Sequence, residues 1–291
     1  MGKKKKERED SAMQIGIRLH DMAPGTLARR LETARRQGFC CAHVALSKTV
    51  DGFKMSEAEQ RLTPEFAAEM KALFASSGQE CVLLGCYQQL ANPDREALEK
   101  TQACYRAHIR FSRWMGARMV GTETPCKTVS FPRPVWESEE AFRLFEDGLR
   151  PVLRYAQEQD VLLAVEPVFC DIVSTPERAQ RLLDDMRSDH LRIILDGVNL
   201  LSNEAALDPG PVIEDAIRRL GDRVALLHMK DFRLVPGERR PVSVACGQGG
   251  MRYERLLSFA REKDLPMTVE NTAPENAAAT REYLEALAAA L

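Results

Sequence analysis

The chain has 291 residues, with 41 lysines and arginines against 43 aspartates and glutamates, and its formal charge is −2. With 44% hydrophobic and 29% charged residues it can bury a large core, and its composition is not that of a disordered chain. It has no run of about 20 apolar residues, no apolar N-terminal stretch and no basic excess, which weighs against a membrane protein, a secreted protein and a nucleic-acid-binding protein.

The first segment, residues 1–12, begins MGKKKKERED and has no apolar periodicity. A charge run of this kind is typical of a solvated, flexible tail, and an arm for nucleic acid or membrane is the weaker interpretation. We therefore expect the fold to occupy residues 13–291 as one domain.

From residue 13 onward, short apolar runs alternate with amphipathic stretches. The apolar runs predict strands at residues 14–19, 39–46, 81–84, 118–121, 161–165, 191–195, 224–227 and 266–269. Helices are predicted at residues 25–37, 64–76, 94–115, 138–158, 176–186, 211–220 and 253–262 and from residue 276 onward. Pro151 is expected to kink or restart the fourth of these helices.

Eight strand-then-helix units in succession predict a single (β/α)8 TIM barrel of the α/β class. The later strands are continuous apolar runs, as expected when both faces of a parallel sheet are buried. A doubly wound open sheet is the main alternative, although it normally uses fewer strands.

The eight cysteines are scattered among the apolar runs, and no C-x-x-C occurs. Cys40, Cys81, Cys104, Cys170 and Cys246 therefore read best as reduced thiols that pack as small hydrophobic groups. This pattern, together with the lack of a signal peptide, predicts a cytoplasmic protein.

Active sites of such barrels lie at the carboxyl ends of the strands. The last four predicted strands end in Glu166, Asp196, His228 and Glu270, at separations of 30, 32 and 42 residues. A single polar residue at a strand end often caps the next turn. Four metal-ligand types on consecutive strands favour a metal site, and the alternative is a structural polar cluster whose members satisfy one another.

Electrostatics favours the metal. Three carboxylates near a barrel axis repel one another, and without a cation at least one of them would have a raised pKa. One divalent ion relieves the repulsion. Oxygen ligands with one imidazole favour Mn2+, Co2+ or Mg2+ over a structural zinc, although Zn2+ can occupy such a site in crystals.

These segments, AVEP, LDGVN, LHMKD and TVEN, resemble the xylose isomerase-like sugar phosphate isomerase/epimerase superfamily, which includes ketose 3-epimerases, hydroxypyruvate isomerases and inosose dehydratases. The similarity extends to LGCY at residues 84–87, to Pro93-Asp94, to GTET at residues 121–124 and to the Gly247-Gln248-Gly249 turn. It implies one divalent metal held by Glu166, Asp196, His228 and Glu270, with Glu166 and Glu270 also acting as the acid–base pair.

The resemblance implies a sugar or sugar phosphate isomerase or epimerase that removes a proton next to a carbonyl and passes through an enediolate. A dehydratase of the inosose or dehydroshikimate type on the same metal site is the alternative. The substrate would be a small polyhydroxylated ketone or sugar. Two positions depart from the family pattern, because Asn199 stands where ketose epimerases usually have His and Arg252 stands where an acidic residue is frequent.

Other residues are expected to support the site. Asn199 and Arg233 are candidates for binding substrate hydroxyls or a phosphate, with a surface role as the alternative for Arg233. Glu123, His20 and Tyr87 end strands four, one and three and are expected to line the same mouth. Asp231 is a candidate second-layer residue that orients His228 or Arg233, with loop capping as the alternative. His43 and His108 are interpreted as structural or exposed.

Two other functions compete. An endonuclease IV-like DNA repair enzyme needs many histidines for three zinc ions, and this chain has five in all and no basic excess. A barrel that only binds a sugar would not need all four ligand types. Neither nucleic acid nor membrane is expected as a partner, and a homo-oligomer is left open.

Overall fold

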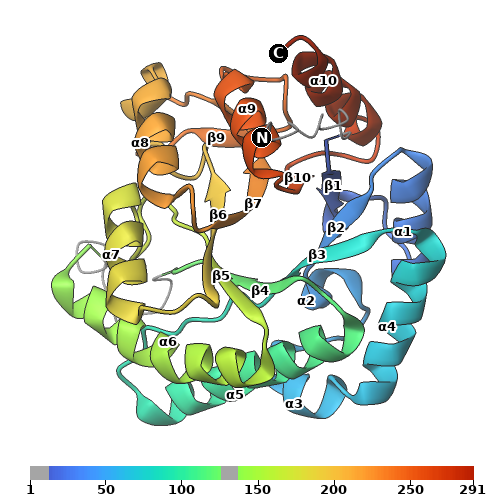
Figure 1. Cartoon of the computed structure of the whole chain (residues 1–291), viewed down its shortest axis with the longest axis vertical. Coiled ribbons are helices and arrows are strands. Elements are labelled where there is room, and N and C mark those ends of the chain that lie inside the picture. The colour runs from blue at the N-terminus through green and yellow to red at the C-terminus, as the bar shows by residue number, and fades with distance from the viewer. Residues whose placement is uncertain (1–12, 126–136) are drawn as a thin grey trace, which may run out of the picture.

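In the computed structural model, which describes residues 13–125 and 137–291, eight parallel strands form a closed barrel surrounded by helices (Figure 1). The strands follow the order β1-β10-β7-β6-β5-β4-β3-β2 around the barrel. Their bounds are β1 Ile15–Arg18, β2 Cys41–Val44, β3 Glu80–Gly85, β4 Met119–Thr122, β5 Leu162–Val165, β6 Leu191–Asp196, β7 Val224–Met229 and β10 Met267–Val269. The predicted barrel is therefore confirmed, and the tail expected at residues 1–12 lies outside the described residues.

The predicted helices are also present, and they form the outer ring. They are α1 Leu27–Arg36, α4 Pro64–Ser77, α5 Arg95–Met115, α6 Glu139–Gln159, α7 Pro176–Met186, α8 Gly210–Leu220, α9 Glu254–Lys263 and α10 Ala277–Ala289. Several begin at a residue whose side chain accepts a hydrogen bond from the first turn, as Thr26, Thr63, Asp94, Ser138 and Thr175 do. No helix of the described residues is long and apolar enough to cross a bilayer.

Helix α6 continues through Pro151, so of the two expectations, a kink or a restart, the restart does not occur. One face of α6 is buried along its whole length, including Phe145, Leu149 and Val152 on either side of the proline. The packing of this face compensates for the hydrogen bond that a proline removes from the helix interior.

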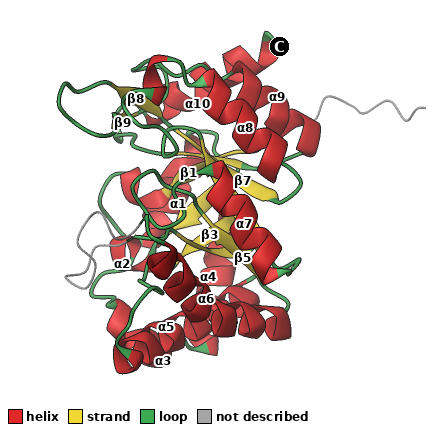
Figure 2. Cartoon of the chain, turned by 90° about the vertical axis from the view of Figure 1, so that its left-hand side faces the viewer, coloured by secondary structure: helices red, strands yellow, loops and turns green. Residues whose placement is uncertain are grey.

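Smaller elements add to the eight units. Between β2 and α4 lie α2 (Leu46–Thr49), η2 (Met55–Glu57) and α3 (Ala58–Arg61), and η1 (Leu19–Asp21) and η3 (Ala205–Leu207) are single turns. After β7, strands β8 (Asp231–Arg233) and β9 (Val242–Val244) form an antiparallel hairpin at the edge of the molecule (Figure 2). Their three-residue length explains why the sequence pattern did not reveal them.

Buried apolar side chains fill the space between strands and helices in one large cluster. A second cluster comes from the strands themselves and consists of Cys41, Val82, Leu83, Met119, Ala164, Ile194 and Leu226. Such strand-only packing is the filling expected inside a barrel of this size, and it leaves only the carboxyl ends of the strands for chemistry.

Candidate functional site

Four buried polar side chains meet at the carboxyl ends of neighbouring strands. Glu166 directly follows β5, Asp196 is the last residue of β6, His228 lies within β7 and Glu270 directly follows β10. They are between 0% and 4% exposed, and β5, β6, β7 and β10 are consecutive in the barrel. The four residues predicted from the sequence therefore lie together at this end of the barrel.

The imidazole of His228 is the centre of the group. Its Nδ1 lies 3.0 Å from Oε2 of Glu166 and 3.3 Å from Oε1 of Glu270. Potential ligand atoms of Glu166, Asp196 and His228 all lie within 4.8 Å of one another, and so do those of His43, His228 and Glu270. The two overlapping sets share His228.

One polar atom of this group, Nε2 of His228, is buried without a hydrogen-bond or ion-pair partner among the described residues. Nδ1 of His228 faces Glu166 and Glu270, and Oδ2 of Asp196 faces Lys230. The other oxygen of Asp196, Oδ1, accepts hydrogen bonds from the backbone N–H groups of Val198 and Asn199 at 2.9 and 3.0 Å. Buried polar atoms without such partners are costly, and they commonly mark a place for an ion or a ligand.

Lys230 contacts the cluster and was not among the residues predicted from the sequence. Its ammonium group lies 2.7 Å from Oδ2 of Asp196 and 3.3 Å from Oε2 of Glu270, and its side chain is 5% exposed. The predicted cluster of three carboxylates therefore already contains one cation of the protein. Lys230 comes two residues after His228, and side chains with this spacing point to the same face of an extended chain, so the segment LHMKD held the signal.

The charges of the group shift one another's pKa values. Burial by itself would raise the pKa of Glu270, but His228 and Lys230 hold it well below its usual range. Burial would also raise the pKa of Glu166, which is lowered instead by His228. Asp196 has the raised carboxyl pKa expected of such a cluster, because burial outweighs the effect of Lys230. Burial would lower the pKa of His228, yet Glu270 and Glu166 raise it to about 9.

His43 lies beside this cluster and is buried, so of the two expectations, structural or exposed, the second does not hold. It is 1% exposed, and its ring stacks on that of His228 with centroids 5.3 Å apart and an interplanar angle of 6°. Its Nδ1 lies 3.6 Å from Oε1 of Glu270, and its Nε2 is hydrogen-bonded to the hydroxyl of Tyr87 at 2.9 Å. A Cβ atom on Gly85 would lie 2.5 Å from the Tyr87 ring, so this packing requires glycine there.

A hollow of about 300 Å³ opens beside the cluster. His20, Tyr87 and Glu123 line it as predicted, and they are joined by Arg18, His43 and Glu270. Arg18 was not predicted, and its Nη1 lies 3.1 Å from Oε2 of Glu270. Burial and Glu166 raise the pKa of Glu123 to about 7, and burial and Arg18 lower the pKa of His20 to about 3. The hollow is lined by both charged and neutral polar groups.

Asn199 is buried and contacts the cluster directly. Its Nδ2 donates a hydrogen bond to Oε1 of Glu166 at 2.6 Å, and its Oδ1 accepts one from Nη2 of Arg240 at 3.0 Å. Arg240, which was not predicted, lies in the loop between β8 and β9. The amide therefore fixes one oxygen of Glu166 and leaves the other directed toward His228.

Arg233 and Asp231 are placed outside the cluster. The exposed Arg233 donates a hydrogen bond from Nε to the carbonyl oxygen of Gln248 at 2.8 Å and lines a different hollow. The carboxylate of Asp231 accepts hydrogen bonds from the backbone N–H groups of Phe232, Gly247 and Met251. Asp231 therefore caps the loop that carries the G-x-G turn, which agrees with the alternative interpretation. A Cβ atom on Gly249 would lie 2.0 Å from the carbonyl oxygen of Phe232, so the turn requires glycine.

His108 also proves to be buried rather than exposed, and it lies at α5, away from this cluster. Its neighbours are Cys104 and Cys86, and together the three side chains form a separate group of potential metal ligands.

Comparison with known proteins gives further information on the fold. The sequence profile of a family described as xylose isomerase-like TIM barrel matches residues 32–290. No curated protein gives a significant match.

Among solved structures, a D-tagatose 3-epimerase-like protein superposes with a TM-score of 0.72 at 15% identity, covering 94% of this chain and 97% of that one. The IolI protein with a binding zinc atom gives 0.69 at 17% identity, with 96% of each chain covered. A xylose isomerase-like TIM barrel protein from Mycobacterium smegmatis in complex with magnesium gives 0.67 at 18% identity, with 96% and 97% covered. Because the sequence identities are below 20%, these similarities establish a shared fold and nothing further.

Proposed function

The chain belongs to the xylose isomerase-like TIM barrel family, and from this premise we propose that it is a divalent-metal-dependent isomerase or epimerase of a small polyhydroxylated ketone or sugar. The observation that carries the proposal is the meeting of Glu166, Asp196, His228 and Glu270 at the carboxyl ends of adjacent strands. Solved structures with the same fold include proteins described as epimerases, which supports the reaction class.

The residues present fit a divalent metal. His228 offers a buried nitrogen, Nε2, without a hydrogen-bond partner among the described residues, and Glu166, Asp196 and Glu270 offer buried carboxylate oxygens beside the ring. With Lys230 charged and His228 neutral, a divalent ion brings the charge of the group close to zero, which is the favourable state for a buried cluster. The oxygen-rich donor set favours Mn2+, Co2+ or Mg2+, and Zn2+ is also compatible with it. When bound, the ion supplies polarisation of the substrate carbonyl.

We assign the acid–base work to Glu166 and Glu270. Each glutamate has one oxygen held by the protein and one directed toward His228: Asn199 holds Oε1 of Glu166, while Arg18 and Lys230 hold Oε2 of Glu270. The low pKa of Glu270 keeps it ionised at neutral pH, so it can accept a proton from the carbon next to the carbonyl.

The fate of that proton decides the product. A proton returned by the second glutamate to the opposite face of the same carbon inverts the centre, and a proton returned to the neighbouring carbon interconverts aldose and ketose. Inversion needs two carboxyl groups that approach the substrate from different strands, and the positions of Glu166 after β5 and Glu270 after β10 meet that need, whereas isomerisation can use one of them alone.

The hollow beside the cluster is the proposed sugar-binding site. His20, Tyr87 and Glu123 line it with donors and acceptors suited to hydroxyl groups, and Arg18 adds a cation. Asn199 touches Glu166 directly, so we assign it to positioning that carboxylate. Arg233 is outside this hollow, and a contact with substrate would need movement of its loop.

The decisive experiment is Glu270→Gln. We expect the turnover number to fall by about 10²- to 10⁴-fold, because an amide cannot accept the proton. Turnover should be followed by NMR with candidate ketoses in D2O, where deuterium enters the carbon that receives a proton. The products show whether the reaction is epimerisation, isomerisation or loss of water.

Glu262→Gln, at an exposed position of α9, is the matched control and should retain full activity. Melting curves of both variants show whether the barrel stays folded. A folded Glu270→Gln protein with full turnover would refute the assignment.

A further inference from the structure

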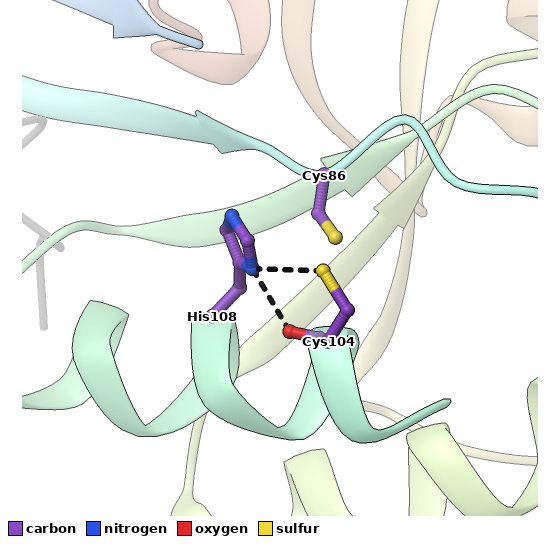
Figure 3. A group of neighbouring side chains, drawn as sticks. All are labelled: Cys86, Cys104 and His108. Atoms are coloured by element: carbon purple, nitrogen blue, oxygen red, sulfur yellow. Dashed lines mark hydrogen bonds between the residues drawn. The ribbon is translucent and has the colours of Figure 1, made fainter. Parts of the chain in front are cut away.

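A second cluster of potential metal ligands lies outside the site described above, between β3 and α5 (Figure 3). Cys86 directly follows β3 and points toward the helix, and Cys104 and His108 point from α5 back toward the strand. Cys104 and His108 are four residues apart, a spacing that places two side chains on one face of a helix. The exposed fractions of the three residues are 0%, 6% and 0%.

The distances between the donor atoms suit one ion. The two sulfur atoms and a ring nitrogen all lie within 4.8 Å of one another, and Sγ of Cys104 lies 3.7 Å from Nδ1 of His108. Zinc bonds of about 2.3 Å to sulfur and about 2.0 Å to nitrogen, at a tetrahedral angle, put these donor atoms roughly 3.5 Å apart. The Cys104–His108 pair is therefore already close to the separation that a shared tetrahedral ion requires.

The hydrogen bonding of His108 leaves one of its nitrogens unused. Nδ1 lies 2.9 Å from the carbonyl oxygen of Cys104, which can only accept, so Nδ1 carries the hydrogen and Nε2 the lone pair. Nε2 is buried without a hydrogen-bond partner among the described residues, and the ring meets Phe53 edge to face. Nδ1 is the nitrogen that faces the sulfur of Cys104, and Nε2 lies on the other side of the ring, so Nδ1 is the nitrogen placed to ligate an ion between the sulfurs.

We propose that Cys86, Cys104 and His108 form a second metal site, which binds a thiophilic divalent cation of the Zn2+ class. Two thiolates balance the charge of such an ion, so the buried complex is neutral. Binding displaces one proton from each thiol to solvent and moves the imidazole hydrogen from Nδ1 to Nε2. The lone pair of Nδ1 then faces the ion, and the hydrogen bond to the Cys104 carbonyl is given up.

Each thiol loses its proton when it becomes a ligand, because the thiolate is the form of cysteine that binds a metal. With three protein ligands, the fourth position is left to water.

The donor chemistry separates the two sites. The barrel end offers carboxylates and imidazole, which suit Mn2+ and Mg2+, whereas the cluster at α5 offers two sulfur atoms, which these hard ions bind poorly. A spectroscopic signal that only a thiolate ligand can give therefore reports on the α5 cluster, whether or not the barrel end holds a metal and whatever reaction the protein catalyses.

Cobalt titration of the reduced full-length protein provides that signal, because Co2+ occupies zinc sites and shows thiolate-to-metal charge-transfer absorption in the near ultraviolet. With the barrel end first saturated with Mn2+, we expect added Co2+ to produce this absorption and Zn2+ to abolish it. Cys86→Ala and Cys104→Ala should each remove at least half of the absorption and weaken metal binding about tenfold or more. Cys81→Ala, a buried cysteine of the same strand β3, is the control and should retain the signal.

A reduced wild-type protein that takes up Co2+ without charge-transfer absorption would overturn the proposal. So would a Cys86–Cys104 disulfide, seen as a loss of two hydrogens by mass spectrometry, in a protein that binds no thiophilic metal after reduction. If the cysteine variants fail to fold, the rate of thiol alkylation in the wild-type protein tests the proposal instead. Zn2+ should slow the alkylation of Cys86 and Cys104 but not that of the exposed Cys40. Equal alkylation rates of Cys86 and Cys104 with and without Zn2+ would refute the site.

Discussion

The ammonium group of Lys230 lies 2.7 Å from Oδ2 of Asp196, and both side chains are almost completely buried. The same ammonium is 3.3 Å from Oε2 of Glu270, so a single cation joins two carboxylates from strands on opposite sides of β7. This arrangement explains how three carboxylates can share the end of a barrel in the absence of metal, and it determines the first prediction.

Lys230→Met should destabilise the metal-free protein by about 3–5 kcal/mol, because it leaves Asp196 and Glu270 buried without their cation. Addition of Mn2+ should raise the melting temperature of the variant more than that of the wild type, since the ion takes over the missing charge. Thermal melts with EDTA and with Mn2+ measure both effects. Lys263→Met, which removes a solvent-exposed ion pair with Asp222, is the control and should leave stability nearly unchanged. An unchanged response to Mn2+ would contradict the prediction.

Asn199→Ala should move the acid limb of the pH profile of kcat/KM to higher pH. The substitution removes the amide that donates to Oε1 of Glu166, and a carboxylate that loses a donor has a higher pKa. We expect the rate at neutral pH to fall about 10- to 100-fold, as is usual when a residue that orients a metal ligand is removed. Arg240→Ala acts only through Asn199 and should have a smaller effect of the same sign. A uniform loss of rate with no shift of the acid limb would show that Asn199 does not act on Glu166.

Tyr87→Phe should reduce the free energy of unfolding by about 1–3 kcal/mol. The hydroxyl of Tyr87 is hydrogen-bonded to Nε2 of His43, and its loss leaves that buried nitrogen without a partner. Urea unfolding measures the change. Tyr155→Phe removes a longer hydrogen bond to Arg110, at 3.4 Å and only partly buried, and should cost less than about 0.5 kcal/mol. If the two substitutions lowered the free energy of unfolding equally, the hydrogen bond between Tyr87 and His43 would contribute no more to stability than the one between Tyr155 and Arg110.

Glu123→Gln should stabilise the metal-free protein at pH 8 and lose this advantage as the pH falls toward 5. Burial and Glu166 raise the pKa of Glu123 from an ordinary 4.5 to about 7, so the folded chain binds more protons than the unfolded chain between these values. The free energy of unfolding of the wild type therefore falls as the pH rises through that window. The amide removes the cost of ionisation, and we expect a gain of about 1–3 kcal/mol at pH 8.

Urea unfolding at several pH values, with EDTA present, tests this dependence. Glu262→Gln on the surface of α9 should leave the pH profile unchanged. A Glu123→Gln profile parallel to that of the wild type would show that Glu123 ionises normally in the fold.

The sequence was most informative where strands are continuous apolar runs followed by one polar residue. Glu166, Asp196, His228 and Glu270 could be found because a parallel barrel places every strand end at the same rim, so position along the chain predicts position in space. His20, Tyr87 and Glu123 followed from the same reasoning, since they stand close to the ends of β1, β3 and β4 and line one hollow.

Contacts that depend on a side chain's direction could not be obtained in this way. His43 lies inside β2, and only the closed barrel shows that its ring stacks on His228 from a strand that is distant in sequence. Arg18, Lys230 and Arg240 reach the cluster through long side chains, and the spacing of residues does not fix where such side chains end. The strands of the short hairpin β8–β9 have only three residues each, too few to show the alternation of apolar and polar residues that marks a strand.

The sequence by itself therefore determined the barrel, the order of its strands and the four residues gathered at the rim, because these follow from the periodicity of apolar residues and from one rule of topology. The tertiary structure alone decided which charges compensate one another at that rim, and that Cys86 meets Cys104 and His108 at a second place. Both are consequences of distances of a few ångströms between segments far apart in the chain, and a pattern along a single chain contains no such distances.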